Sequence, residues 1–193
     1  MSNTRPDTRY TSPPPAELVP AWRAVFERQK AFGEHAFGQL DDAGFFRSPG
    51  EGLNSVAVIA QHIAGNLHSR FTDFLTTDGE KAWRDRDAEF VSPGPTGASR
   101  AHLMAQWESG WRTLFGALDA LAPEDLSREV TIRGVPHPVH AALARAIDHY
   151  AFHVGQINVI ARLHVGSAGW KWFTLPPGGT AAFNASLGHT GGV

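Results

Sequence analysis

The chain has 193 residues, of which 42% are hydrophobic and 19% charged, and its formal net charge is −2. This composition is typical of one globular domain with a sizeable core. The small net charge gives no electrostatic reason to expect nucleic acid or an anionic membrane as a partner. The chain has no cysteine. Disulfides, thiolate metal ligands and a cysteine nucleophile are therefore excluded, and metal chemistry would depend on imidazole and oxygen ligands.

Residues 1–16 are polar and contain consecutive prolines, which predicts a disordered N-terminal arm. The arm lacks the apolar core of a signal peptide, and no apolar run of the chain approaches the roughly 18 residues that a membrane span requires. We therefore expect a cytoplasmic protein in which residues 17–193 form a single domain.

Two amphipathic segments predict helices in the first half of the chain. In the first, from Glu17 to Leu40, apolar residues recur mostly at three- and four-residue steps, as they do on one face of a helix. Breaker residues at 41–44 should end it. The second helix should begin at Asn54 or Ser55, since either is a good N-cap, and continue to about Thr77. A connection of roughly 20 residues, 78–97, follows, and connections of that length are often functional.

The second half of the chain predicts two more helices, over residues 99–121 and 139–164, with the same apolar periodicity. Between them, Val130, Ile132 and Val135 around Arg133-Gly134 predict a short β-hairpin. The tail from Gly169 is rich in aromatic and breaker residues and should pack irregularly across the helices. The predicted fold class is all-α: a four-helix bundle with a short β-hairpin before the last helix and an irregular C-terminal tail.

Three histidines are the strongest chemical signal. His149 and His153 lie four residues apart in HYAFHVGQI, so both imidazoles leave the same face of a helix one turn apart. This offset suits two ligands of one metal ion, although an isolated pair is weak evidence. His62, in AVIAQHIAGNL of the second helix, is a third candidate. All three border the apolar stripes, and three imidazoles would leave a coordination position open for water or substrate.

Other polar residues are candidates for substrate binding. Asn66 and Asp73 follow His62 on nearly the same helix face, and Gln156 lies beside His153; each could orient a ligand or substrate, or form only a structural hydrogen bond or ion pair. In the long connection, the segment Trp83–Arg86 could form a lid in which Arg84 and Arg86 recognise an anionic substrate. The alternative is a solvated surface loop with one buried tryptophan.

The segments AVIAQHIAGNLHSRFTDFL, TTDGEKAWRDRDAEF and HYAFHVGQINVIARL resemble the DinB-like (YfiT-like) superfamily of four-helix-bundle metal proteins, and in particular a bacterial branch described as a domain of unknown function. The resemblance covers nearly the whole chain. It implies a metal bound by one histidine of the second helix and two of the fourth, at the positions of His62, His149 and His153. It also implies a homodimer.

Three imidazoles suit zinc, nickel or iron, and the residues do not distinguish among these metals. Some relatives implied by the resemblance are transferases and isomerases that use a small thiol such as mycothiol or bacillithiol, which the metal activates as thiolate. The first hypothesis is accordingly a metal-dependent enzyme acting on a small molecule, a thiol S-transferase of stress or detoxification. The second is a non-catalytic metal-binding stress protein. The third is a helix bundle with three structural histidines and no metal.

Overall fold

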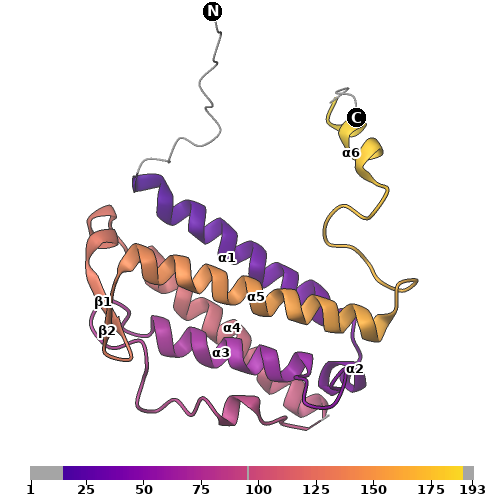
Figure 1. Cartoon of the computed structure of the whole chain (residues 1–193), viewed down its shortest axis with the longest axis horizontal. Coiled ribbons are helices and arrows are strands. Elements are labelled where there is room, and N and C mark those ends of the chain that lie inside the picture. Colours follow the sequence, from indigo (N-terminus) through magenta and orange to yellow (C-terminus); the bar gives the residue numbers. More distant parts are fainter. Residues whose placement is uncertain (1–14, 95, 189–193) are drawn as a thin grey trace, which may run out of the picture.

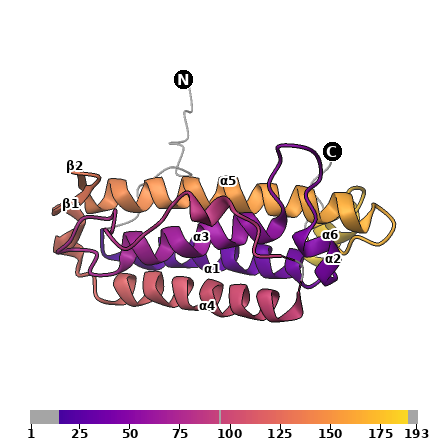
Figure 2. The same ribbon diagram turned by 90° about the horizontal axis from the view of Figure 1, so that it is seen from below.

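The computed structural model describes residues 15–94 and 96–188, and the expected N-terminal arm lies almost entirely outside these residues. Four long helices form the body of the molecule (Figure 1): α1 (Pro15–Phe37), α3 (Val56–Phe71), α4 (Gly97–Asp119) and α5 (Val139–Val165). Helix α1 packs mainly against α5, and α3 packs mainly against α4. Figure 2 shows α5 and α4 on opposite sides, with α3 and α1 between them. The predicted four-helix bundle is confirmed.

Large aromatic side chains join the helices at the centre of the core. Phe26 of α1, Trp111 of α4 and Tyr150 of α5 are all fully buried. Their ring centroids lie 5.6–6.5 Å apart in tilted or edge-on pairs, the arrangement that the quadrupoles of aromatic rings favour. This cluster fixes α5 against α1 and α4, and therefore determines which face of α5 turns towards α3.

The predicted hairpin is confirmed. Strand β1 (Glu129–Ile132) pairs antiparallel with β2 (Val135–Pro138), with Ile132 opposite Val135. The two turn residues, Arg133 and Gly134, have φ of 56° and 71°, as a type I′ turn requires, and this turn matches the twist of the strands that it joins. A 3₁₀ helix, η3 (Pro123–Ser127), precedes the hairpin.

The first two predicted helices differ from the structure in their bounds. The first helix starts two residues earlier than expected and ends at Phe37 instead of Leu40. Residues 41–44, expected to be breakers, begin a further helix, α2 (Asp42–Phe46), because the Asp41 side chain accepts a hydrogen bond from Gly44 N at 2.7 Å and caps it. The second helix begins after Ser55, as expected, but ends at Phe71 instead of Thr77.

The C-terminal tail differs in part from its expectation. Its first residues pack at the end of α1, where Lys171 N donates to Gln39 Oε1 at 2.7 Å and Phe173 lies against Phe32. The chain then leaves the bundle and forms a short helix, α6 (Thr180–Ser186), which has no buried residue and projects from the body (Figure 1). The tail therefore does not cross the bundle. Among the described residues, no helix is both long enough and apolar enough to span a membrane.

Candidate metal centre and adjoining cavity

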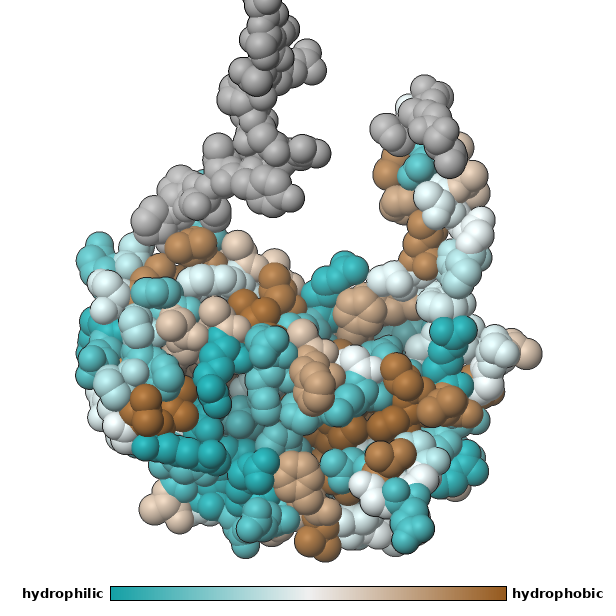
Figure 3. All heavy atoms as spheres, in the orientation of Figure 1, coloured by the Kyte–Doolittle hydropathy of each residue, from teal (hydrophilic) through white to brown (hydrophobic). Residues whose placement is uncertain are grey.

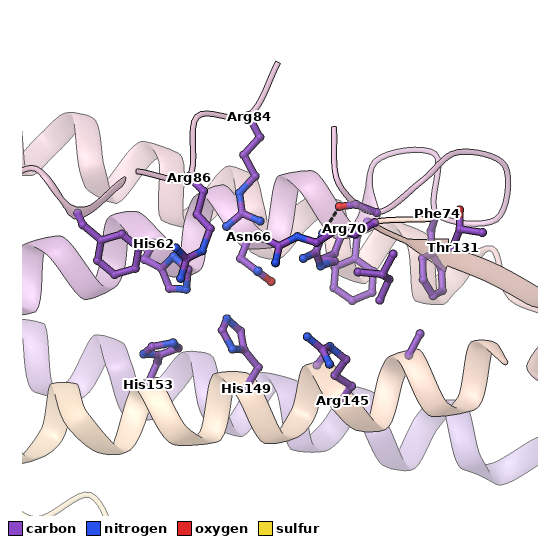
Figure 4. A pocket seen from close by; sticks show the side chains of 17 residues that line it. His62, Asn66, Arg70, Phe74, Arg84, Arg86, Thr131, Arg145, His149 and His153 are labelled. Atoms are coloured by element: carbon purple, nitrogen blue, oxygen red, sulfur yellow. Dashed lines mark hydrogen bonds between the residues drawn. The ribbon is translucent and has the colours of Figure 1, made fainter. Parts of the chain in front are cut away.

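The three predicted ligands meet between α3 and α5. His62 comes from α3, and His149 and His153 come from successive turns of α5. One ring nitrogen from each lies within 4.8 Å of the others, and their ring centroids are 4.6–5.3 Å apart. Figure 4 shows the three imidazoles pointing towards one another across the space between the helices. The structure thus forms a three-histidine group that could hold a metal ion.

Hydrogen bonds fix the orientation of two of these rings. Nδ1 of His62 lies 2.8 Å from Oε2 of Glu89, and Nδ1 of His153 lies 2.8 Å from Oε1 of Gln156. Both oxygens can only accept, so each Nδ1 carries a proton, and Nε2 is the nitrogen of each ring that remains for a metal ion. Metal-binding histidines characteristically donate their second nitrogen to a carboxylate or carbonyl oxygen in this way.

The third ring carries an unsatisfied atom. Nε2 of His149 is buried and has no hydrogen-bond partner in the described part of the chain, which is unusual because nearly all buried polar atoms are paired. Burial, together with the neighbouring charges of His153 and His62, lowers the pKa of His149 to about 3. Burial also lowers the pKa of His153. Both imidazoles are therefore neutral near pH 7 and available as ligands, so the residues present fit a divalent transition metal.

Glu89 is a site residue that sequence reasoning missed. It belongs to the 3₁₀ helix η2 (Ala88–Phe90) in the long connection, and it is 7% exposed. Arg84 donates to its two carboxylate oxygens at 2.7 and 2.8 Å. Burial alone would raise the Glu89 pKa, but the hydrogen bonds from His62 and Arg84 and the Arg84 charge lower it below its usual value. Glu89 is therefore a carboxylate that faces His62.

Comparison with known proteins identifies the family of the chain. The model of the family described as "Protein of unknown function (DUF1572)" matches residues 15–179, which include all three histidines and Glu89. The chain belongs to this family. No curated protein matches the chain.

In this member of the family, a cavity of about 210 Å³ adjoins the three histidines and extends between α3, α5 and the hairpin. Asn66, one of the predicted binding residues, lines it (Figure 4). Its amide oxygen accepts a hydrogen bond at 3.0 Å from the buried hydroxyl of Tyr150, which leaves the amide NH2 to face the cavity. The potential metal site is therefore open on one side, towards a cavity with space for a small molecule.

The other two predicted binding residues lie elsewhere. Gln156 is not among the described residues that line the cavity, and its side chain is hydrogen-bonded to His153. Asp73 lies beyond the end of α3, has φ of 49° and is exposed, so it does not share the face of His62. Asp73 also forms no ion pair with the nearby Arg70, which donates to Gly79 O and to Glu80.

The long connection contributes to the site, but differently from the expectation for residues 83–86. Trp83 is 61% exposed, whereas the Arg84 side chain is 2% exposed, so the expected burial of the tryptophan is wrong. Arg84 and Arg86 both line the cavity. The connection therefore covers one side of the histidine cluster and supplies three charged residues of the site, Arg84, Arg86 and Glu89.

Proposed function

We propose that this chain is a metal-dependent enzyme that binds one divalent transition metal (zinc, nickel or iron) through Nε2 of His62, His149 and His153. The observation that carries the proposal is that three imidazoles, two of them oriented by hydrogen bonds, converge at one end of a cavity large enough for a small molecule. When bound there, such a metal supplies Lewis-acid activation of a coordinated water, thiol or carbonyl oxygen.

The residues of the chain have separate tasks in this proposal. Glu89 and Gln156 hold the rings of His62 and His153 so that Nε2 of each faces the centre. Asn66, held by Tyr150, presents its NH2 group as a hydrogen-bond donor to a substrate. Phe90 packs 4.8 Å from the His62 ring and limits access of water from that side.

The narrower proposal is a thiol S-transferase within the DinB-like superfamily. The sequence resemblance supports it. Because the chain has no cysteine, the thiol of such a reaction would have to be an external one such as bacillithiol. Cobalt(II) substitution tests both the metal site and the binding of a thiol to the metal. Absorption bands of a tetrahedral cobalt centre, absent from His153→Ala, would support the metal site. New near-ultraviolet charge-transfer absorption on adding a small thiol would support thiol binding to the metal. Unchanged spectra with all thiols tested would remove the S-transferase proposal.

The second candidate is a non-catalytic metal-binding stress protein. It would need a closed site in which the protein or a buried water completes the coordination. The adjoining cavity favours the enzyme, because a site that serves stability has no use for substrate space. If no substrate is turned over and the cobalt spectrum does not change when ligands are added, the results favour this candidate instead.

We also propose that two copies of the chain form a homodimer through α1, α5 and the tail. A cavity of about 450 Å³ lies between these segments, and Val159 of α5 is 61% exposed. Figure 3 shows hydrophobic residues on the projecting tail and over the C-terminal part of α5. Light scattering should give the mass of a dimer for the wild type and for the control Leu53→Asp, and of a monomer for Val159→Asp. A monomeric wild type would overturn this proposal.

A further inference from the structure

Among the described residues, the lining of the cavity beside the histidines contains no acidic residue and five arginines: Arg70, Arg84, Arg86, Arg133 and Arg145. Three carboxylates pair with these arginines. Glu80 pairs with Arg70 and Arg133 at 3.0 and 3.1 Å, Glu89 pairs with Arg84 at 2.7 Å, and the exposed Asp87 lies 3.8 Å from Arg86. Three carboxylates beside five arginines leave the surroundings of the cavity with an excess of positive charge, to which a bound metal would add. The natural complement of such a cavity is an anion.

The arginines continue a regular arrangement of side chains that begins at the histidines. On α3, His62, Asn66 and Arg70 follow at steps of four residues, so they lie on one face. On α5, His153, His149 and Arg145 follow at the same step in the opposite direction. Figure 4 shows the two rows facing each other, with Arg70 opposite Arg145. Each arginine is one helical turn, about 6 Å, beyond Asn66 or His149.

Arg84, which lines the cavity, has a hydrogen-bond donor without an acceptor. Its Nε and Nη2 donate to Glu89, but Nη1 is buried and has no hydrogen-bond partner among the residues that the structure describes. The nearest carboxylate oxygen, Oε2 of Glu80, is 3.7 Å away, which is beyond hydrogen-bond distance. The side chain is only 2% exposed. A buried guanidinium nitrogen without an acceptor is costly, and an oxyanion in the cavity would supply the acceptor.

Arg145 is available for a ligand. Within residues 15–94 and 96–188 it forms no ion pair or hydrogen bond through its side chain, and it reaches the cavity from the side opposite Arg84 and Arg70 (Figure 4). A guanidinium group binds carboxylate and phosphate oxygens with two parallel hydrogen bonds. Arg84 and Arg145 therefore offer donors from two walls of one cavity.

The far end of the cavity, beyond the arginines, is largely apolar, with Phe71, Phe74, Ile132 and Ala142 in its lining. The volume of about 210 Å³ is below the roughly 300–1,000 Å³ of sites for drug-sized ligands. Both features restrict the ligand to a small molecule that combines an anionic group with an apolar part.

We infer that the cavity is an oxyanion-binding site in which Arg84, Arg145 and Arg70 hold the carboxylate or phosphate group of a small, partly apolar molecule. Its identification as the substrate site of an enzyme rests on the proposed function, since it assumes a metal at the three histidines one to two helical turns away. Binding of the anion itself requires only the arginines.

The test uses the full-length, chelator-treated protein and phenylacetate, a carboxylate with an apolar ring, in calorimetric titrations at constant ionic strength. Phenylacetamide, which has the same shape without the charge, is the matched ligand. We expect saturable binding of phenylacetate, at least tenfold weaker in Arg145→Gln, and unchanged in Arg112→Gln, which removes an exposed arginine of α4. Binding of phenylacetamide should be at least tenfold weaker than that of phenylacetate.

Inorganic phosphate should compete with phenylacetate for the wild type. Equal binding of the acid and the amide, absence of competition by phosphate, or full affinity in Arg145→Gln would each overturn the oxyanion site. Zinc titration of Arg145→Gln distinguishes failure of the oxyanion site from failure of the proposed metal centre. If Arg145→Gln binds zinc like the wild type but no longer binds phenylacetate, the metal centre and the oxyanion site are two separate sites. Phenylacetate binding without any zinc binding would overturn the metal centre and leave the oxyanion site intact.

Discussion

Oε2 of Glu89 lies 2.8 Å from Nδ1 of His62, although the two residues are 27 positions apart and belong to different elements. The contact joins the long connection to helix α3 at the histidine cluster. Arg84 holds the same carboxylate from the other side. The connection is therefore part of the site, because it sets the tautomer of one predicted metal ligand and supplies a wall of the cavity.

Glu89→Gln should weaken zinc binding about 10- to 100-fold, the usual cost of losing a residue that orients a metal ligand. The amide keeps an acceptor for His62 but loses the negative charge that increases the basicity of the ring. Competition with a chromogenic chelator measures the affinity. Glu124→Gln removes an exposed carboxylate outside the site and should bind zinc like the wild type. Wild-type affinity in Glu89→Gln would show that Glu89 is only a structural partner of Arg84.

Gly65 permits the close approach of Glu89 to helix α3. A Cβ atom at Gly65 would lie 2.2 Å from Oε1 of Glu89 and 2.7 Å from its Cδ, so an alanine there must displace the carboxylate from His62 and Arg84. Gly65→Ala should therefore lower the free energy of unfolding and weaken zinc binding, although glycine to alanine within a helix ordinarily stabilises by about 0.5–1 kcal/mol.

Gly116→Ala is the matched control for Gly65→Ala, because nothing lies within 4 Å of a Cβ at this position of α4. Urea unfolding should show a gain of about 0.5–1 kcal/mol for Gly116→Ala and a loss for Gly65→Ala. A gain in both variants would mean that Glu89 moves aside at no cost, and that its position against α3 is unimportant.

Asp78 should make the stability of the protein sensitive to acid. Its carboxylate accepts hydrogen bonds from the backbone N–H groups of Arg133, Gly134 and Glu80 at 2.6–2.8 Å. Although burial would raise the Asp78 pKa, these bonds hold it well below its ordinary value of 3.8. A depressed pKa means that this stabilisation is complete above pH 3.8 and is lost as the pH falls below it.

The free energy of unfolding of the wild type should therefore fall more steeply below pH 4 than that of Asp78→Asn, which cannot ionise. At pH 7 the wild type should be the more stable of the two. Urea unfolding at a series of pH values from 7 to 3 checks both statements. Parallel curves for the two proteins would contradict a role of the Asp78 charge in holding the hairpin turn.

Tyr150→Phe should lower the free energy of unfolding by about 0.5–1.5 kcal/mol, the usual net contribution of one hydrogen bond. The change removes the buried hydroxyl that donates to the Asn66 amide oxygen and leaves the ring packing intact. Asn66→Ala and the double variant complete a mutant cycle that isolates this pair. A coupling free energy near zero would show that Asn66 is held by something other than Tyr150. The zinc stoichiometry of Tyr150→Phe should equal that of the wild type.

The bundle and the meeting of the three histidines could be predicted because their signals are periodic. Apolar steps of three and four residues determine which face of each helix is buried, and the four-residue step between His149 and His153 places both on one face. Arg145 and Arg70 continue the same steps, so the two facing rows were present in the sequence. Recognising them requires knowledge that α3 and α5 are adjacent and antiparallel.

The long connection could not be predicted to the same depth. Glu89 has no periodic relation to His62, and a loop of mixed charges gives no sign that Arg84 is buried while its neighbour Trp83 is exposed. The one signal in the sequence was Gly65, an interior helical glycine beside Asn66, which marks a close approach of another group. Asp73 was misplaced because its left-handed backbone conformation ends the helix face on which the prediction depended.

Metal analysis of protein purified without an affinity tag tests the central claim most directly. Elemental analysis should find about one transition-metal ion per chain, as three histidine ligands to a single ion require. His149→Ala and His153→Ala should lose it, and His102→Ala, which changes an exposed histidine of α4, should retain it. A folded wild type that stays metal-free after incubation with zinc, nickel and iron would contradict the claim and leave the three histidines a structural role.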